Sequence, residues 1–258
     1  MIKLTIWNEN YHEKTNDYVH ELHPDGIHMT LARGLADPEF FIRTATLDEP
    51  DQGLPDELLN DTDVLIWWGH ARHKYVSDEL AFRIVQRVND GMGIIFLHSA
   101  HKSKPFKYLL GTQGDLRWRE IGEHCNIWTA TSSHPIAQGI PEMFRIDHEE
   151  MYGEPFGIPT PEDVVFICWF AGGDVFRSGV TFKRGSGKIF YFQPGHETFR
   201  SYEHPWVLKV IKNAVFWAKS DTSVPLTTRQ IRQPAEELDP ATLESHSVHQ
   251  NGPENGFV

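Results

Sequence analysis

Three short apolar runs in the first hundred residues each stop at a polar cluster. They are Leu4–Trp7, Val64–Trp68 and Gly93–Leu97. A run that is apolar at consecutive positions, rather than at alternate ones, indicates a strand buried on both faces, which is typical of parallel sheets. A further strand is predicted over Phe40–Ala45. The pattern therefore predicts several strands of one parallel sheet.

Helical patterns separate these strands. Residues 15–35 are predicted to be mostly helical, with a break at Pro24-Asp25-Gly26. A second helix begins after Ser77, a residue type that caps helix N-termini, and runs through Val88 to a stop at Gly91. Alternating strands and helices predict right-handed crossovers, and hence an α/β fold with a doubly wound, mainly parallel sheet flanked by helices.

The second half of the chain is less regular. Strands are predicted over 164–170, 179–184 and 188–192, and the last two form a hairpin across Gly185-Ser186-Gly187. Residues 205–219 predict an amphipathic final helix. We therefore expect one α/β domain over residues 1–220.

Apolar content falls after Ser220, and residues 221–258 contain several prolines and few large apolar side chains. Such a segment cannot easily bury a core of its own. We interpret it as an extended C-terminal arm or a disordered tail. An arm of this kind often packs on a neighbouring subunit, so we also expect a homo-oligomer.

Charge and composition narrow the choice of partner. The formal net charge of −12 disfavours nucleic acid and anionic membrane surfaces, which would repel the chain. No run of about 18 apolar residues is present, as a membrane-spanning helix would need. Cys125 and Cys168 lack metal-type spacing and are expected to be inert buried thiols, which points to the cytoplasm.

Histidines gather where the predicted strands end. The four polar clusters concerned are Asn8–Glu13, Gly69–His73, His98–His101 and Gly195–Glu197. A lone histidine is more often a surface residue or a satisfied core residue than a functional one. However, ligands of parallel sheets bind beyond the carboxyl ends of the strands, so four such clusters favour a common site. We predict that His12, His70, His98 and His196 surround one cleft.

The segment from Gly93 to His101 predicts a strand that enters a helix through a tight turn. This geometry resembles a nucleophile elbow, which exposes one side chain above the sheet. The expected slot falls near His98 and Ser99, and neither cysteine is close in the sequence. Ser99 could act as a nucleophile, but the Gly-x-Ser-x-Gly pattern is absent. The more favoured interpretation is that His98 serves as an acid, a base or a metal ligand.

Several stretches in order along the chain resemble the ThuA-like trehalose-utilisation family, a branch of the class I glutamine amidotransferase-like superfamily. They are Tyr11-His12, Trp67-Trp68-Gly69-His70, Gly93–Ser99, His134-Pro135-Ile136 with Gly139, Asp147–Tyr152 and Gly195-His196. The resemblance covers roughly residues 1–220, and it implies a flavodoxin-like fold and a link to disaccharide breakdown. The amidotransferase cysteine is replaced by His98-Ser99, and Glu197 directly follows His196, so release of ammonia from glutamine is not expected.

The remaining site residues are assigned on this basis. We predict that His98, Glu150 and His196 are catalytic, although Glu150 could equally belong to a solvated charge run. His70, His98 and His196 are candidate ligands for zinc or another divalent ion, and no nucleotide cofactor is expected. The residues predicted to bind a sugar are Tyr11, His12, Trp68, Ser99 and Tyr152.

Two functions remain open at this point. The first is an enzyme, or enzyme subunit, that acts on a sugar or a sugar-derived carbonyl compound through a His/Glu site. The second is a non-catalytic sugar-binding or regulatory module that lost the amidotransferase nucleophile. A fold alone does not choose between them, because function depends on the site.

Overall fold

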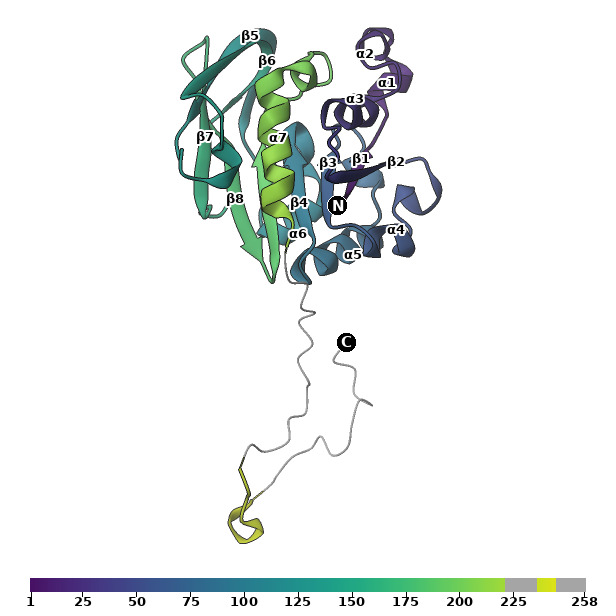
Figure 1. Cartoon of the computed structure of the whole chain (residues 1–258), viewed down its shortest axis with the longest axis vertical. Helices are drawn as coiled ribbons and strands as arrows, with labels where there is room; N and C mark the ends of the chain where they lie inside the picture. Colours follow the sequence, from purple (N-terminus) through teal and green to yellow (C-terminus); the bar gives the residue numbers. More distant parts are fainter. Residues whose placement is uncertain (221–235, 245–258) are drawn as a thin grey trace. The chain divides into compact units, whose positions relative to one another are not determined.

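The computed structural model describes residues 1–220 and 236–244 (Figure 1). The predicted arm therefore lies outside the described residues except for 236–244, which contain a single 3-10 turn, Pro240–Thr242. The arm and the homo-oligomer stay predictions. Among the described residues, no helix is both long enough and apolar enough to cross a membrane.

Nine strands of the described chain form one sheet in the order β2-β1-β3-β4-β9-β8-β7-β5-β6. Their bounds are β1 Ile2–Asn8, β2 Phe40–Thr46, β3 Val64–Trp68, β4 Gly93–Leu97, β5 Arg117–Thr129, β6 Met143–Gly153, β7 Asp163–Phe170, β8 Val175–Arg184 and β9 Gly187–Phe192. The pairings from β2 to β9 are parallel, whereas those from β9 to β6 are antiparallel. The expected parallel sheet is thus present, and an antiparallel half extends it into a mixed sheet.

The parallel half contains the strands that the apolar runs predicted. Every residue of β3 and β4 is buried, as expected for strands covered on both faces. In β1, Trp7 stacks on Trp67 of β3 with ring centroids 3.7 Å apart. This packing holds the neighbouring strands in register, so that β1, β3, β4 and β9 all end at the same edge of the sheet.

Two groups of helices accompany the sheet (Figure 1). The α-helices are α1 His12–Thr15, α2 Asp17–Leu22, α3 Ile27–Gly34, α4 Asp56–Asn60, α5 Asp78–Asn89, α6 Lys104–Leu110 and α7 Pro205–Ala218. Leu208 of α7 packs on Gly34 of α3, while α5 contacts both α4 and α6. Ser77 caps α5 as predicted, and Gly26 (φ 91°) breaks the first helical stretch. The flavodoxin-like winding stays a prediction.

The antiparallel half includes two strands that the sequence analysis did not predict, β5 and β6. Most of β5 is exposed or partly exposed, and its register with β6 shifts between Arg119 and Cys125. Such a strand lacks the strict apolar alternation by which half-buried strands are recognised. These two strands nevertheless carry Glu120 and Glu150 to the edge where the parallel strands end.

Candidate functional site

The turn after β4 places His98 in a left-handed backbone conformation, with φ at 50°. This conformation is uncommon for a residue other than glycine, and the surroundings must hold it. Nδ1 of His98 donates to the backbone carbonyl of Gln193 at 2.8 Å, and Nε2 lies 2.9 Å from the carboxylate of Glu150. The elbow geometry is therefore present, and His98 rather than Ser99 occupies its strained position.

The expected exposure of His98 is wrong, because its side chain is fully buried. Tyr152 of β6 stacks on its ring at 4.8 Å between centroids, and Glu150 of the same strand covers Nε2. Burial alone lowers the pKa of His98, but the hydrogen bond and charge of Glu150 outweigh it and raise the pKa to about 9. The same pairing outweighs burial at Glu150 and lowers the pKa of that carboxyl. The pair is therefore ionised at neutral pH.

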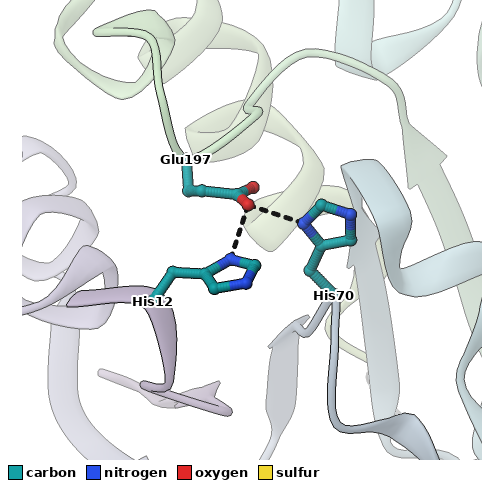
Figure 2. Close-up of side chains that lie close together, drawn as sticks. All are labelled: His12, His70 and Glu197. Atoms are coloured by element: carbon teal, nitrogen blue, oxygen red, sulfur yellow. Dashed lines mark hydrogen bonds and ion pairs between the residues drawn. The ribbon is translucent and has the colours of Figure 1, made fainter. Parts of the chain in front are cut away.

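Glu197 lies at the centre of a second group of side chains, shown in Figure 2. Its Oε1 is 2.6 Å from Nδ1 of His12 and 2.7 Å from Nδ1 of His70. Burial would raise the pKa of Glu197, but the two histidines hold it well below its usual range. His12 follows β1, His70 follows β3 and Glu197 follows β9, so three strand ends supply this group.

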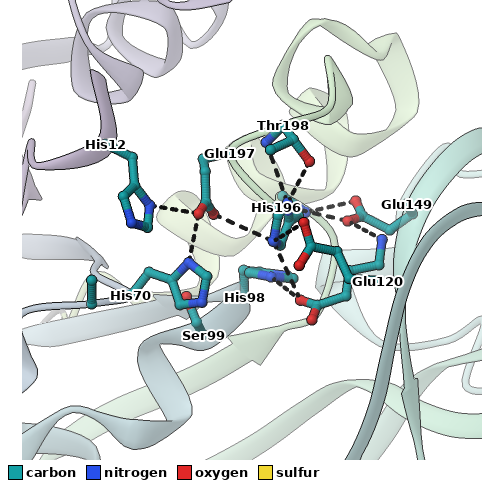
Figure 3. Close-up of polar contacts among 12 residues, drawn as sticks. His12, His70, His98, Ser99, Glu120, Glu149, His196, Glu197 and Thr198 are labelled. Atoms are coloured by element: carbon teal, nitrogen blue, oxygen red, sulfur yellow. Dashed lines mark hydrogen bonds and ion pairs between the residues drawn. The ribbon is translucent and has the colours of Figure 1, made fainter. Parts of the chain in front are cut away.

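His196 connects the two groups (Figure 3). Its Nε2 lies 3.7 Å from Glu120, 3.8 Å from Glu150 and 3.7 Å from Oε2 of Glu197. Its Nδ1 is 2.7 Å from the hydroxyl of Thr198. Burial lowers the pKa of His196 to about 4, which keeps the ring neutral at physiological pH.

A fully buried carboxylate, Glu149, holds the loop that carries His196 and Glu197. It accepts hydrogen bonds from the backbone amides of Gly195 at 2.8 Å and His196 at 3.2 Å, and from the Ser201 hydroxyl at 2.6 Å. The backbone amide of Glu150 also donates to it, at 2.9 Å. Burial raises the pKa of Glu149, whereas these donors and the charge of His98 lower it. Glu150 is buried as well, so the alternative that it belongs to a solvated charge run is wrong.

A cavity of about 460 Å³ opens beside these groups. It is lined by His70, His73, Ser99, His101, Lys102, Asp115, Leu116, Trp118, Glu120, Glu150 and Tyr152. Its size suits a small organic ligand. Glu150 faces the cavity. His98 does not line the cavity, and it can influence a bound ligand only through its contact with Glu150.

The structure brings together most of the predicted residues. The ring centroids of His12 and His70 are 5.4 Å apart, those of His70 and His196 are 5.5 Å apart, and those of His98 and His196 are 5.3 Å apart. The four histidines therefore gather at one edge of the sheet as predicted, but of the four only His70 lines the cavity, so they do not all surround one cleft. The hydroxyl of Tyr152 lies 3.2 Å from Nε2 of His98.

Three predicted residues have other environments. Trp68 is fully buried, and its indole nitrogen donates to the carbonyl of Gly195 at 3.1 Å, so its ring cannot stack on a sugar. Tyr11 lines a separate hollow with Arg72. The hydroxyl of Ser99 donates to the carbonyl of Gly69 at 2.8 Å, and no described histidine nitrogen is hydrogen-bonded to it. This arrangement gives Ser99 no activating base.

The sequence analysis missed Glu120, Glu149 and Glu197. Glu197 was set aside because it directly follows His196 instead of standing two positions after it, as an amidotransferase triad requires. Its signal was its place in a strand-end cluster together with Gly195 and His196. Glu149 lies within the motif Asp147–Tyr152, where only Glu150 was singled out, and Glu120 carried no comparable signal because its strand was not recognised.

The candidate metal ligands fall into two sets among the described residues. One is His12, His70 and Glu197, and the other is His98, Glu150 and His196. Within each set, the atoms that could bind an ion all lie within 4.8 Å of one another. The expected set of His70, His98 and His196 is therefore divided between them, and each set gains a carboxylate.

The fold and the site define an α/β protein with a histidine- and carboxylate-lined centre where its parallel strands end. The family model for ThuA, described as trehalose utilisation, matches residues 3–218. The chain belongs to this family, as its sequence motifs indicated. A comparison with curated proteins found no match.

Solved structures share the fold at low sequence identity. A putative ThuA-like protein from Parabacteroides merdae is 15% identical, with a TM-score of 0.64 over 87% of this chain and 93% of the other. A cytoplasmic protein from Salmonella typhimurium is 14% identical, with a TM-score of 0.60 over 85% and 100%. A β-galactosidase from Rahnella sp. R3 is 11% identical, with a TM-score of 0.55 over 88% and 33%.

Proposed function

We propose that the protein is an enzyme that transfers protons on a sugar or a sugar-derived carbonyl compound. The observation that carries this proposal is a pair of carboxyl groups, Glu120 and Glu150, that face one cavity and have opposite pKa shifts. Burial and the nearby charges of Glu150 and Glu197 raise the pKa of Glu120. Carboxyl groups whose pKa values are shifted in opposite directions are the usual signature of an acid and a base.

The roles follow from position. Glu150, which His98 keeps ionised, is the base, and Glu120 at the half-exposed mouth of the cavity is the proton donor. His98 is a positioning residue, because it contacts Glu150 and does not line the cavity. His196 lies between the two carboxyls, with Nε2 3.7 Å from Glu120 and 3.8 Å from Glu150, and can relay a proton between them.

The substrate class rests on the family and on the cavity wall. Membership of the trehalose-utilisation family supports a sugar. Sugars offer C–H faces that pack on aromatic rings and hydroxyls that need charged or polar partners. Trp118 and Tyr152 supply the rings, while Lys102 and Asp115 supply charged groups.

The proposal is tested by hydrogen–deuterium exchange. The purified protein is incubated in D₂O with a panel of aldoses, ketoses and disaccharides, and the C–H signals beside each carbonyl are followed by proton NMR. The expected result is exchange or isomerisation of at least one sugar, reduced by at least about 100-fold in Glu150→Gln, as loss of a general base predicts. The control is His148→Gln, an exposed position on β6.

Two results would contradict the proposal that the protein is a proton-transferring enzyme. One is exchange that is equally fast in wild type and in Glu150→Gln. The other is thermal stabilisation by a sugar, with no exchange and no bond cleavage for any compound in the panel, which would indicate the non-catalytic binding module. Cleavage of a glycosidic bond would appear in the same spectra as new anomeric signals and would replace carbonyl chemistry with hydrolysis.

We also propose a cytoplasmic location. Cys125 and Cys168 are buried and free, which suits a reducing compartment. One solved neighbour is described as a cytoplasmic protein. Fractionation of cells that express the full chain tests this location, and recovery in a secreted fraction would contradict it.

A further inference from the structure

We propose that His12, His70 and Glu197 bind one divalent metal ion of the zinc class at the wall of the cavity. The ligand atoms are Nδ1 of both histidines and a carboxylate oxygen, a donor set that suits zinc and similar ions. In Figure 2 both histidine nitrogens point toward the same carboxylate oxygen of Glu197. The metal site does not depend on the proposed function, whereas the use of the ion on a sugar does.

Hydrogen bonds within the cluster leave two buried atoms unsatisfied. Oε2 of Glu197 has no hydrogen-bond partner, although the residue is only 3% exposed. Nδ1 of His12 forms an ion pair with Oε1 of Glu197 at 2.6 Å but not in the geometry of a hydrogen bond. A buried carboxylate oxygen without a partner is costly, and nearly all such groups in folded proteins are paired. A cation held by Glu197 and His12 would satisfy both.

The spacing of the ligands is compatible with an ion after a small adjustment. The nitrogen–oxygen distances of 2.6 and 2.7 Å are shorter than the separation of about 3.3 Å between two ligands on a tetrahedral zinc ion. An outward movement of about 0.6 Å is therefore needed. Rotation of the half-exposed side chains of His12 and His70 can supply it.

The position of the cluster also leaves room for a substrate. The side chains of His12 and His70 are 25% and 33% exposed, so an ion can enter from solvent. Three protein ligands leave at least one coordination position open, as in catalytic rather than structural zinc sites. His70 also lines the cavity that contains Glu120 and Glu150. A bound ion would therefore polarise a substrate oxygen beside the proton-transferring carboxyls.

In the second set of possible metal ligands, the nitrogens of His98 already have hydrogen-bond partners. Both nitrogens of His98 make hydrogen bonds, to the Gln193 carbonyl and to Glu150. The three side chains of this set are at most 6% exposed, and an ion bound here would have to displace the ion pair of His98 with Glu150. We therefore assign the metal to Glu197 and its two histidines, and proton transfer to Glu150 and its neighbours.

Calorimetric titration of the full chain with ZnCl₂, after dialysis against a chelator, tests this assignment. The expected result is one zinc equivalent for the wild type and at least about 100-fold weaker binding for Glu197→Gln. His70→Gln, at a partly exposed position, provides the same test if the Glu197 variant does not fold. Glu150→Gln and the control His148→Gln should bind zinc as the wild type does. Titration with CoCl₂ reports histidine coordination through its visible absorption bands.

Three results would overturn the metal site. They are no zinc binding at millimolar concentration, equal affinity in wild type and Glu197→Gln, or a loss in Glu150→Gln as large as that in Glu197→Gln. Failure of the proposed function would look different, because zinc would still bind with the expected variant pattern while no sugar exchanged deuterium. Exchange that persists in metal-free protein would instead remove the ion from the reaction.

Discussion

Replacing the buried carboxylate Glu149 with alanine should destabilise the protein strongly. The substitution leaves four donors without their acceptor, namely the amides of Glu150, Gly195 and His196 and the hydroxyl of Ser201. A buried donor left unpaired costs about 1–3 kcal/mol, and water entering the vacated space offsets part of the total. We therefore expect a loss of about 4 kcal/mol in the free energy of unfolding from these four donors.

Two further variants test whether the loss of stability in Glu149→Ala comes from these hydrogen bonds. Ser201→Ala removes one of the donors and should cost about 1 kcal/mol, while Glu142→Ala, at an exposed position, should change stability by less than about 0.5 kcal/mol. Urea unfolding followed by both tryptophan fluorescence and circular dichroism measures all three, with coincident transitions as the check on two-state behaviour. A loss below about 1 kcal/mol for Glu149→Ala, or equal losses for Glu149→Ala and Ser201→Ala, would refute the anchoring role.

Three further predictions concern the elbow and the core. His98 has a folded-state pKa of about 9 against an ordinary value of 6.5, so the stability it contributes is complete below pH 6.5 and lost as pH rises through 9. The free energy of unfolding should fall over that interval, and it should fall less in Glu150→Gln; equal slopes would exclude the ion pair as the cause. Phe96→Ala, at a fully buried position of β4, should cost about 3–5 kcal/mol in urea unfolding, and a cost near zero would show that the core is misassigned. Tyr152→Phe keeps the ring stacked on His98 but removes one hydrogen bond, so thermal unfolding should report a loss of about 1 kcal/mol, and a loss above 3 kcal/mol would indicate a further role for the hydroxyl.

The parallel half of the fold could be predicted because its strands are apolar on both faces. β3 and β4 are buried at every position, so their runs stand out from the surrounding sequence. β5 and β6 could not be predicted in the same way, since β5 is largely exposed and its bulges interrupt any alternation. Recognition of a strand depends on a regular difference between its two faces, and β5 has little of it.

The histidines of the site and Glu150 could be predicted, but Glu120, Glu149 and Glu197 could not. Each histidine follows an apolar run, and parallel strands end at one edge, which is enough to bring His12, His70 and His98 together. The role of Glu197 depends on partners far away in the sequence, and the His70–Glu197 pair spans 127 positions. Burial of Glu149 likewise depends on a loop that follows β9, which no local pattern reveals.

The insertion of β9 beside β4 also determines when the site can form. β9 is the last strand in chain order, and the loop after it carries His196 and Glu197, whereas His12 and His70 belong to the first strands. Contacts between such distant segments form slowly, because a long stretch of chain must be closed first. During synthesis, His12 and His70 leave the ribosome long before Glu197, with which they pair. A ribosome must therefore translate almost the whole sheet before the nascent chain can possess a complete centre.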